Sequence, residues 1–293
     1  MLRKPHRPVV IACVCGSDGY DETFLRLTEE AAAQSPDLIV LPEAWQGWAG
    51  NPDREGATEK LKAMAKQYHC YIVHPTLFDD GDKTYNTALV IGRDGELCGR
   101  YDKVYPYWGE LEQVLPGLSR PVIDCDFGKL GIAICFDANF SNVWAGLAAQ
   151  GAELVVWPSA YGAGMQLAAH ALNHHYPIVT STLSGHCMAF DIDGQRSVNV
   201  RSDGHYIQWH EIDLDRCLFH ENFNEEKLAP LLKESPRRVE IEKRLLDEQW
   251  IIVRAAAAGQ SARDVCAAAG MEELRQYKAR SRTHIDHMRE PIS

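Results

Sequence analysis

Short apolar runs alternate with amphipathic segments over roughly the first two thirds of the chain. Runs that are apolar on both faces, such as 8–15, 37–41 and 154–157, predict buried strands. Segments with apolar residues three or four positions apart predict helices, the clearest of which cover 55–68, 142–150 and 165–175. Strands alternating with helices indicate the α/β class, and the number of strands favours two packed sheets with helices outside them.

Turn signals divide this pattern into pairs of strands. Asp94-Gly95 lies between two strand-like runs at 84–91 and 96–101 and predicts a hairpin. Phe127-Gly128 and Asp193-Gly194 predict two more turns, and Gly151 predicts the end of a helix. The last strand of this region is expected at 206–212.

The composition changes after Asp215. The stretch 221–293 lacks clear strand signals and is rich in Glu, Arg and Ala, so helices are predicted at 241–258 and 272–288. The predicted organisation is a main domain over 1–220 and a helical C-terminal extension over 221–293. Residues 260–277 also have the pattern of a helix-turn-helix, for which helical contacts between subunits are a commoner explanation than DNA binding.

Charge and composition narrow the possible partners. The net charge of −11 makes nucleic acid an unfavourable partner. The apolar runs are too short for a membrane span or a signal core, so a cytoplasmic protein without a membrane partner is expected. Nine cysteines without CxxC spacing predict mainly buried free thiols rather than disulfides or zinc ligands.

A pair of histidines raises the question of a metal. His170 and His174 are four positions apart in a predicted helix and therefore share a face. A zinc site needs three or four ligands, and the sequence shows no third one near them. We expect neither a metal nor a cofactor.

Three reactive side chains follow predicted strands. Glu43 comes after the strand 37–41, Lys103 after the strand that reaches Tyr101, and Cys135 after the apolar run 131–134. Open α/β sheets place their reacting groups at the carboxyl ends of strands. A thiol needs a base and a nearby cation to attack, and a lysine can also stabilise an oxyanion. The three residues together therefore predict a cysteine nucleophile with an acid–base carboxylate.

The motifs around these residues resemble those of the nitrilase superfamily, the carbon–nitrogen hydrolases. The segments are Leu41-Pro42-Glu43, the stretch 101–110 (YDKVYPYWGE) and the stretch 131–137 (GIAICFD). Weaker matches follow in the right order, and the resemblance covers about Pro8 to Asp215. It implies a four-layer α-β-β-α sandwich, often paired into a homodimer or larger homo-oligomer through helices beside the nucleophile.

The resemblance also implies a role for each matched residue. Glu43 becomes the general base, Lys103 the oxyanion-stabilising cation and Cys135 the nucleophile. Glu110 matches a second glutamate that hydrogen-bonds the lysine and positions substrate. The backbone N–H of Phe136 becomes the second oxyanion donor.

The sequence departs from the family pattern on both sides of the nucleophile. Tyr105 stands before Pro106, where the family usually has histidine, and Asn139 stands where carbamoylases use arginine for a substrate carboxylate. Phe136-Asp137 is more typical of amidases than of nitrilases. A small amide is thus favoured over a nitrile, and an N-carbamoyl amino acid is less favoured. The substrate itself cannot be read from the sequence.

Aromatic residues follow the reactive blocks. We interpret them either as core packing or, with Asn139, as a substrate-binding wall. They are Trp45, Trp48, Tyr107, Trp108, Trp157 and Tyr161.

The predicted activity is hydrolysis of a small amide through a cysteine thioester, with release of an acid and an amine or ammonia. Hydrolysis of a nitrile or an N-carbamoyl group, and transfer of the acyl group to another acceptor, remain alternatives. An inactive binding module with a helical partner-binding tail is the non-enzyme alternative.

Overall fold

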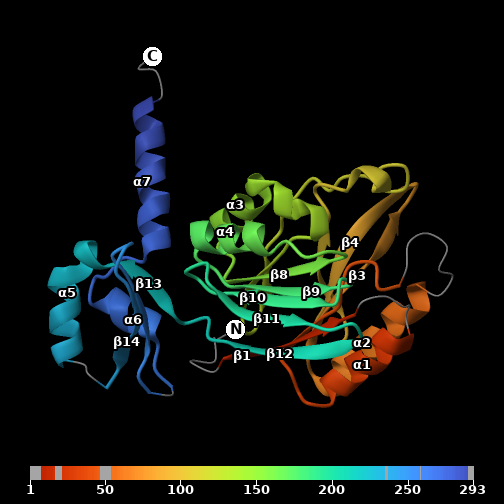
Figure 1. The fold of residues 1–293 in the computed structure, drawn as a ribbon, viewed down its shortest axis with the longest axis horizontal. Coiled ribbons are helices and arrows are strands. Elements are labelled where there is room, and N and C mark those ends of the chain that lie inside the picture. The colour runs from red at the N-terminus through yellow and green to blue at the C-terminus, as the bar shows by residue number, and fades with distance from the viewer. Residues whose placement is uncertain (1–7, 17–21, 47–53, 235–236, 258, 290–293) are drawn as a thin grey trace. The chain divides into compact units, whose positions relative to one another are not determined.

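The chain folds into two compact units. The computed structural model describes residues 8–16, 22–46, 54–234, 237–257 and 259–289. The first unit is Val9–Ile212, and the second contains the chain from Asp213 onward (Figure 1). Within the described residues, none of the helices combines the length and the apolar character that crossing a bilayer requires.

The first unit contains two six-stranded sheets of similar construction. The first sheet has the order β12-β1-β2-β3-β4-β5. Strands β1, β2 and β3 are parallel, and β12, β4 and β5 pair antiparallel at the two sides. The strands are β1 (Val9–Cys15), β2 (Leu38–Val40), β3 (Tyr71–Asp80), β4 (Lys83–Ile91), β5 (Leu97–Asp102) and β12 (Tyr206–Ile212).

The second sheet has the order β11-β10-β9-β8-β7-β6. Its strands β7, β8 and β9 are parallel, and the other neighbours pair antiparallel. The strands are β6 (Ile123–Cys125), β7 (Gly128–Ile132), β8 (Leu154–Ser159), β9 (Ile178–Thr182), β10 (His186–Phe190) and β11 (Arg196–Arg201).

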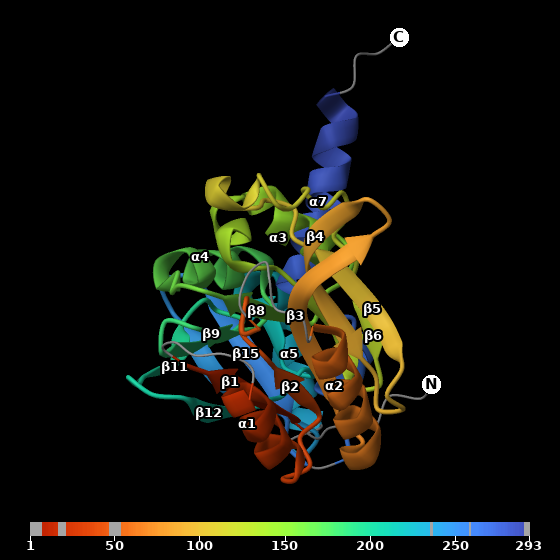
Figure 2. The ribbon, with the colours of Figure 1, turned by 90° about the vertical axis from the view of Figure 1, so that its right-hand side faces the viewer.

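Helices cover the outer face of each sheet. Helices α1 (Glu22–Ala32) and α2 (Arg54–Tyr68) lie on the first sheet, and α3 (Ser141–Ala149) and α4 (Gly164–His174) lie on the second (Figures 1 and 2). The side chains of β1 point alternately to the two neighbouring layers. Ala12 and Val14 face the helices, and Cys13 and Cys15 face the other sheet. The predicted four-layer α-β-β-α sandwich is confirmed.

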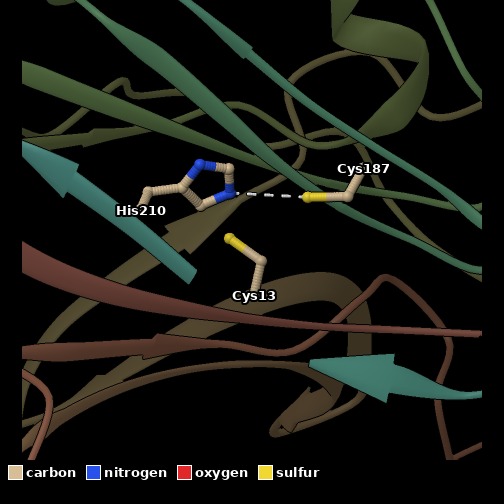
Figure 3. A group of neighbouring side chains, drawn as sticks. All are labelled: Cys13, Cys187 and His210. Carbon is tan, nitrogen blue, oxygen red and sulfur yellow. Dashed lines mark hydrogen bonds between the residues drawn. The ribbon is translucent and has the colours of Figure 1, made fainter. Parts of the chain in front are cut away.

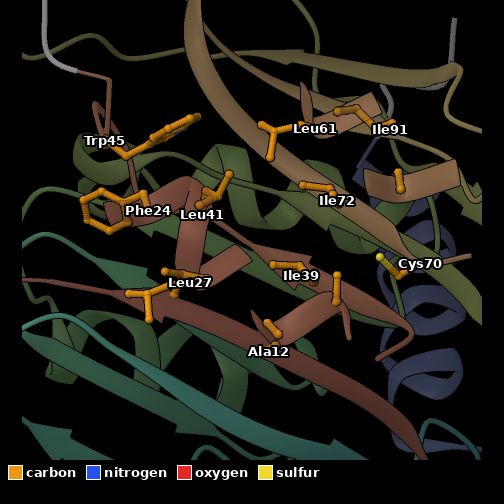
Figure 4. Close-up of a cluster of buried hydrophobic side chains, with 14 of the residues drawn as sticks. Ala12, Phe24, Leu27, Ile39, Leu41, Trp45, Leu61, Cys70, Ile72 and Ile91 are labelled. Atoms are coloured by element: carbon orange, nitrogen blue, oxygen red, sulfur yellow. The ribbon is translucent and has the colours of Figure 1, made fainter. Parts of the chain in front are cut away.

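A buried apolar cluster joins the first sheet to its helices. Phe24 and Leu27 of α1 and Leu61 of α2 pack against Ile39 and Ile72 of the central strands (Figure 4). Burying a side chain of this size stabilises the fold by roughly 1.5–3 kcal/mol. This cluster fixes the strand ends from which the site residues follow.

The predicted turns lie where the sequence places them. The Asp94-Gly95 turn joins β4 to β5, and Gly95 has a φ of +83°. A Cβ on Gly95 would lie 2.7 Å from the backbone oxygen of Lys62 in α2, so glycine is required for conformation and for space. Gly151 follows α3 with a φ of +82°, as predicted for a helix stop.

The second unit corrects one prediction. The helix predicted over 241–258 is wrong, since β14 (Val239–Leu245) and β15 (Trp250–Ala255) pair there with β13 (Cys217–His220) in the order β13-β15-β14. Burial alternates along β14, which is the period of a strand, and Glu240, Glu242 and Arg244 lie on the exposed face. Those charged residues favour helices in isolation, which explains the error.

Helices do form the rest of this unit. They are α5 (Glu221–Glu234), α6 (Ala262–Ala268) and α7 (Leu274–Arg289). Residues of α5, α6 and the three strands share one buried apolar cluster that includes Phe219, Leu228, Ile251 and Val265. Gly270, at a φ of +74°, lies between α6 and α7, as the helix-turn-helix pattern predicts. The extension is therefore a small α+β unit with a long C-terminal helix.

Candidate active site

Three strand ends bring the reactive side chains together. Glu43 lies three residues after β2, Lys103 directly follows β5, and Cys135 lies three residues after β7. Cys135 also begins a short 3-10 turn, Cys135–Asn139. All three residues are buried, with at most 8% of their surface exposed.

Lys103 lies between two carboxylates. Its Nζ donates to Glu43 Oε1 at 2.8 Å and to Glu110 Oε1 at 2.6 Å. Burial acts to lower the pKa of Lys103, but the charges of Glu43, Cys135 and Glu110 raise it above its ordinary value. Lys103 is therefore a permanent cation, which suits it to stabilise negative charge and excludes it as a base.

Asn86 of β4 joins the two carboxylates from the other side. Its Nδ2 donates to Glu43 Oε1 at 2.9 Å and to Glu110 Oε2 at 3.1 Å. The second oxygen of Glu43 accepts the backbone N–H of Ala160 at 3.0 Å. These bonds fix the Glu43 carboxylate in one orientation.

Cys135 has an unusual backbone conformation. Its φ is +46°, in the left-handed region that residues with a Cβ seldom adopt. The Trp157 indole N–H holds the Cys135 carbonyl at 3.1 Å, and Asp137 accepts the N–H of Ile134 at 2.9 Å. Such strain persists only where surrounding contacts impose it, and it commonly occurs at functional sites.

The Cys135 thiol is a proton donor in this setting. Burial raises its pKa to about 12, and the charge of Glu43 and a hydrogen bond with Glu43 add to the rise. The Lys103 ammonium and a hydrogen bond with Ser159 act in the opposite direction. The thiol is therefore protonated at rest, and Glu43 is the adjacent group that can accept its proton.

Asp137 organises the loop around Cys135. Its carboxylate accepts the Tyr101 hydroxyl at 2.6 Å, the N–H of Tyr105 at 2.9 Å and the N–H of Ile134. Burial raises the pKa of Asp137 to about 6, and these hydrogen bonds limit the rise. Tyr105, which replaces the usual histidine, stacks on Phe140 with ring centroids 3.7 Å apart.

The aromatic residues have different environments. Trp45 is fully buried in the core cluster, and its indole N–H donates to His74 Nδ1 at 3.2 Å. Trp157 is also fully buried and supports the Cys135 backbone. Tyr107 and Trp108 are 56% and 81% exposed. The predicted aromatic wall thus has two members in the interior, and Trp48 lies outside the described residues.

Asn139 and Tyr161 lie at the 3-10 turn that begins with Cys135. Asn139 Nδ2 donates to the Phe136 carbonyl at 3.1 Å and approaches the Tyr161 hydroxyl at 3.5 Å. Gln166 donates to Asn139 Oδ1 at 2.7 Å. Tyr107 meets the ring of Phe136 edge-on, with centroids 5.9 Å apart. A group of neutral polar and aromatic side chains therefore surrounds the turn.

The histidine pair of α4 belongs to the packing of the second sheet. His170 Nε2 contacts the Ala138 carbonyl at 2.8 Å, and its ring stacks on Trp144 at 4.4 Å. His174 lies on the same face, with its ring centroid 6.5 Å from that of His170. His170 thereby supports the 3-10 turn that begins with Cys135.

The sequence profile of the carbon–nitrogen hydrolase family matches residues 19–218, so the chain belongs to this family. Among curated relatives, a chloroplastic omega-amidase of Arabidopsis thaliana is 29% identical over 156 residues, which are 45% of this chain and 42% of the relative. A nitrilase of Pyrococcus abyssi is 33% identical over 147 residues, 46% of this chain and 56% of the relative. The matched segment spans about half the length of these relatives.

Solved structures share the fold. Nit3 of Saccharomyces cerevisiae, a member of branch 10 of the nitrilase superfamily, has a TM-score of 0.64 at 21% identity, covering 77% of this chain and 96% of its own. A variant of the amidase from Nesterenkonia sp. AN1, with acrylamide added to its active-site cysteine, has a TM-score of 0.63 at 20% identity, covering 70% and 93%. These likenesses support the same sandwich architecture.

Proposed function

We propose that the chain hydrolyses a small amide through a thioester on Cys135. The observation that carries this proposal is the buried set of Glu43, Lys103 and Glu110, with hydrogen bonds of 2.6–2.8 Å, beside the strained Cys135. Family membership and the similarity to omega-amidases and amidases support the same reaction class.

Acylation begins with attack of the Cys135 sulfur on the amide carbon. The thiol proton passes to Glu43, and the carbonyl oxygen becomes an oxyanion. Lys103 Nζ and the N–H of Phe136 stabilise that oxyanion, since the first N–H groups of a helical turn lack partners within the turn. The C–N bond then breaks, and Glu43 returns the proton to the leaving amine.

Water completes the reaction. It attacks the thioester carbon while Glu43 again accepts a proton, and the same two donors stabilise the second oxyanion. Collapse releases the carboxylic acid, and the proton returns to the sulfur of Cys135. The sum is one amide and one water converted to an acid and an amine or ammonia. Glu110 and Asn86 keep Lys103 and Glu43 in place throughout.

We propose an uncharged acyl group for the substrate. Among the described site residues, Lys103 is the one cation, and two carboxylates already hold it. Asn139, Gln166 and Tyr161 offer neutral hydrogen-bonding groups instead. A substrate carboxylate would lack a counter-charge from these side chains. Amides with an apolar or neutral acyl chain are therefore expected to react faster than amides with a second, carboxylate end.

Matched substrates and a matched variant test the activity. Ammonia release is measured with propionamide, succinamate, propionitrile and an N-carbamoyl amino acid, and intact mass follows the acyl adduct. We expect turnover of propionamide, a transient adduct on the protein, and loss of both in Cys135→Ala. Cys98→Ala, at an exposed thiol away from the site, is the control and should keep both. Full turnover by Cys135→Ala would refute the mechanism, and preference for succinamate would refute the uncharged acyl group.

We further propose that two copies of the chain pair through the helices beside Cys135, of which α4 is one. We also propose that the protein is cytoplasmic. Met165 and Leu172 of α4 support the pairing because they are 89% and 39% exposed. Light scattering should give a mass of two chains. Met165→Lys should shift the mass toward one chain, and a monomeric wild-type protein would contradict the pairing.

A further inference from the structure

Three metal-binding side chains meet between the two sheets of the first unit. Cys13 comes from β1, His210 from β12 and Cys187 from β10 of the opposite sheet (Figure 3). One ligand atom of each lies within 4.8 Å of the others. Both cysteines are fully buried, and His210 is 4% exposed. These residues have no part in the proposed amide hydrolysis.

The strand register explains the convergence. Cys13 pairs with Gln208, and Ile11 pairs with His210, so Cys13 and His210 are diagonal neighbours on one face of the first sheet. That face points at the second sheet, where Cys187 follows the tight connection after β9. Cys15 lies two residues along β1 on the same face, and its thiol hydrogen-bonds Cys187.

The separation of the His210 and Cys187 ligand atoms matches that of two ligands in a tetrahedral site. His210 Nε2 lies 3.5 Å from the sulfur of Cys187. With a Zn–S bond of about 2.3 Å and a Zn–N bond of about 2.05 Å, tetrahedral geometry places the two ligand atoms about 3.5 Å apart. A thiol and an imidazole at this distance make only a weak hydrogen bond, whereas a cation between them would bind both.

The Nε2 atom of His210 is the ring nitrogen that meets the cysteines, because it lies against the sulfur of Cys187. The other ring nitrogen, Nδ1, is buried without a hydrogen-bond partner among the described residues.

We propose that Cys13, Cys187 and His210 bind one zinc ion that joins the two sheets, with Cys15 as the nearest further donor. Binding breaks two S–H bonds, forms two Zn–S bonds and one Zn–N bond, and releases two protons. The two thiolates neutralise the charge of the ion, which makes the complex compatible with its buried position. Cys187 then exchanges its hydrogen bond to the Thr180 carbonyl, 3.0 Å in length, for the metal bond.

Soft sulfur ligands with one imidazole select zinc over the hard cations. Because the site is buried, the ion enters as the sheets assemble, and binding is coupled to folding. The site is thus structural, and the proposal stands or falls independently of the amidase activity.

Metal content tests the proposal on the full chain. The protein is produced with zinc under reducing conditions and analysed by mass spectrometry of its metals. We expect about one zinc ion per chain. Cys187→Ser and His210→Gln should lose it, and Cys70→Ala should retain it, because Cys70 is an equally buried thiol outside the cluster.

Cobalt provides a measurement on the wild-type sequence itself. Refolding with Co²⁺ should produce the thiolate-to-cobalt absorption and the visible bands of a tetrahedral ion, with two protons released per ion. A wild-type protein that holds no zinc and shows no such bands after refolding would overturn the proposal. A mass two units lower, located to a Cys13–Cys187 disulfide in the freshly purified protein, would overturn it as well.

Discussion

The Glu43→Gln variant is expected to lose turnover, while the pKa of its Cys135 thiol is expected to fall. The two effects have opposite signs because Glu43 has two influences on Cys135. In the proposed mechanism it is the base, and it is also a negative charge that opposes formation of the thiolate.

The size of both effects follows from the site. In the wild type the pKa of Cys135 is about 12, raised by burial, by the Glu43 charge and by the Glu43 hydrogen bond, and lowered by Lys103. Glutamine removes the charge and leaves the Lys103 cation, so the pKa should fall toward that of an ordinary thiol. A fall of about two units gives roughly 100-fold more thiolate at pH 8. Loss of the base should lower kcat by about 100- to 10,000-fold.

The assay measures both properties on the same preparations. Methyl methanethiosulfonate, a small reagent without an amide, labels Cys135, and intact mass follows the rate from pH 6 to pH 10. In the variant, labelling should rise about tenfold per pH unit up to its new pKa. In the wild type it should vary less with pH, because transfer of the thiol proton to Glu43 leaves the number of bound protons unchanged.

A second variant should change the labelling rate of Cys135 in the opposite direction. Lys103→Met removes the cation that favours the thiolate, so labelling of Cys135 should become slower than in the wild type. Labelling of the exposed Cys98 controls for reagent quality and folding. A labelling rate at pH 10 that is no higher in Glu43→Gln than in the wild type would refute the reasoning about Glu43.

Three further perturbations follow from the same contacts. Asn86→Ala removes the donor shared by both carboxylates, so kcat should fall about 10- to 100-fold in steady-state assays; an unchanged kcat would contradict its positioning role. Trp157→Phe removes the indole donor to the Cys135 carbonyl and should lower the free energy of unfolding by about 1 kcal/mol in urea titrations. Burial lowers the pKa of His74 to about 3, below its unfolded value of 6.5, so the stability gained from its neutral form is present above pH 6.5 and lost as the pH falls toward 3. Between pH 7 and pH 5, the free energy of unfolding measured in urea titrations should fall by about 2 kcal/mol more in the wild type than in His74→Gln.

Local sequence patterns are sufficient for the scaffold of the first unit. Apolar runs on both faces mark its central strands, and glycines with positive φ mark its turns. The reactive residues follow strand ends, where side chains leave the sheet and meet. For this reason the positions of Glu43, Lys103 and Cys135 could be predicted before any coordinates, and the family resemblance added Glu110.

The side chains that hold these residues in place could not be predicted in the same way. Asn86 lies within a strand, and only the assembled sandwich shows that its amide reaches both carboxylates. Asn86 has polar neighbours on both sides in β4, so the local pattern gave no distinct signal for it. Trp45 and Trp157 have the same hydrophobic character in the sequence as the exposed Trp108, because burial depends on what packs against a side chain.

The amino-acid sequence by itself determined the class of the fold and the order of the first unit's elements, since both depend on short-range periodicity or on motifs. Its motifs also indicated the three positions that we propose as reactive. Tertiary structure decided the strands of the second unit, because the pairing of β14 with β15 outweighs the helix propensity of its charged residues. It also decided the meeting of Cys13, Cys187 and His210. Those residues are far apart in the chain, and only the packing of one sheet on the other brings their ligand atoms together.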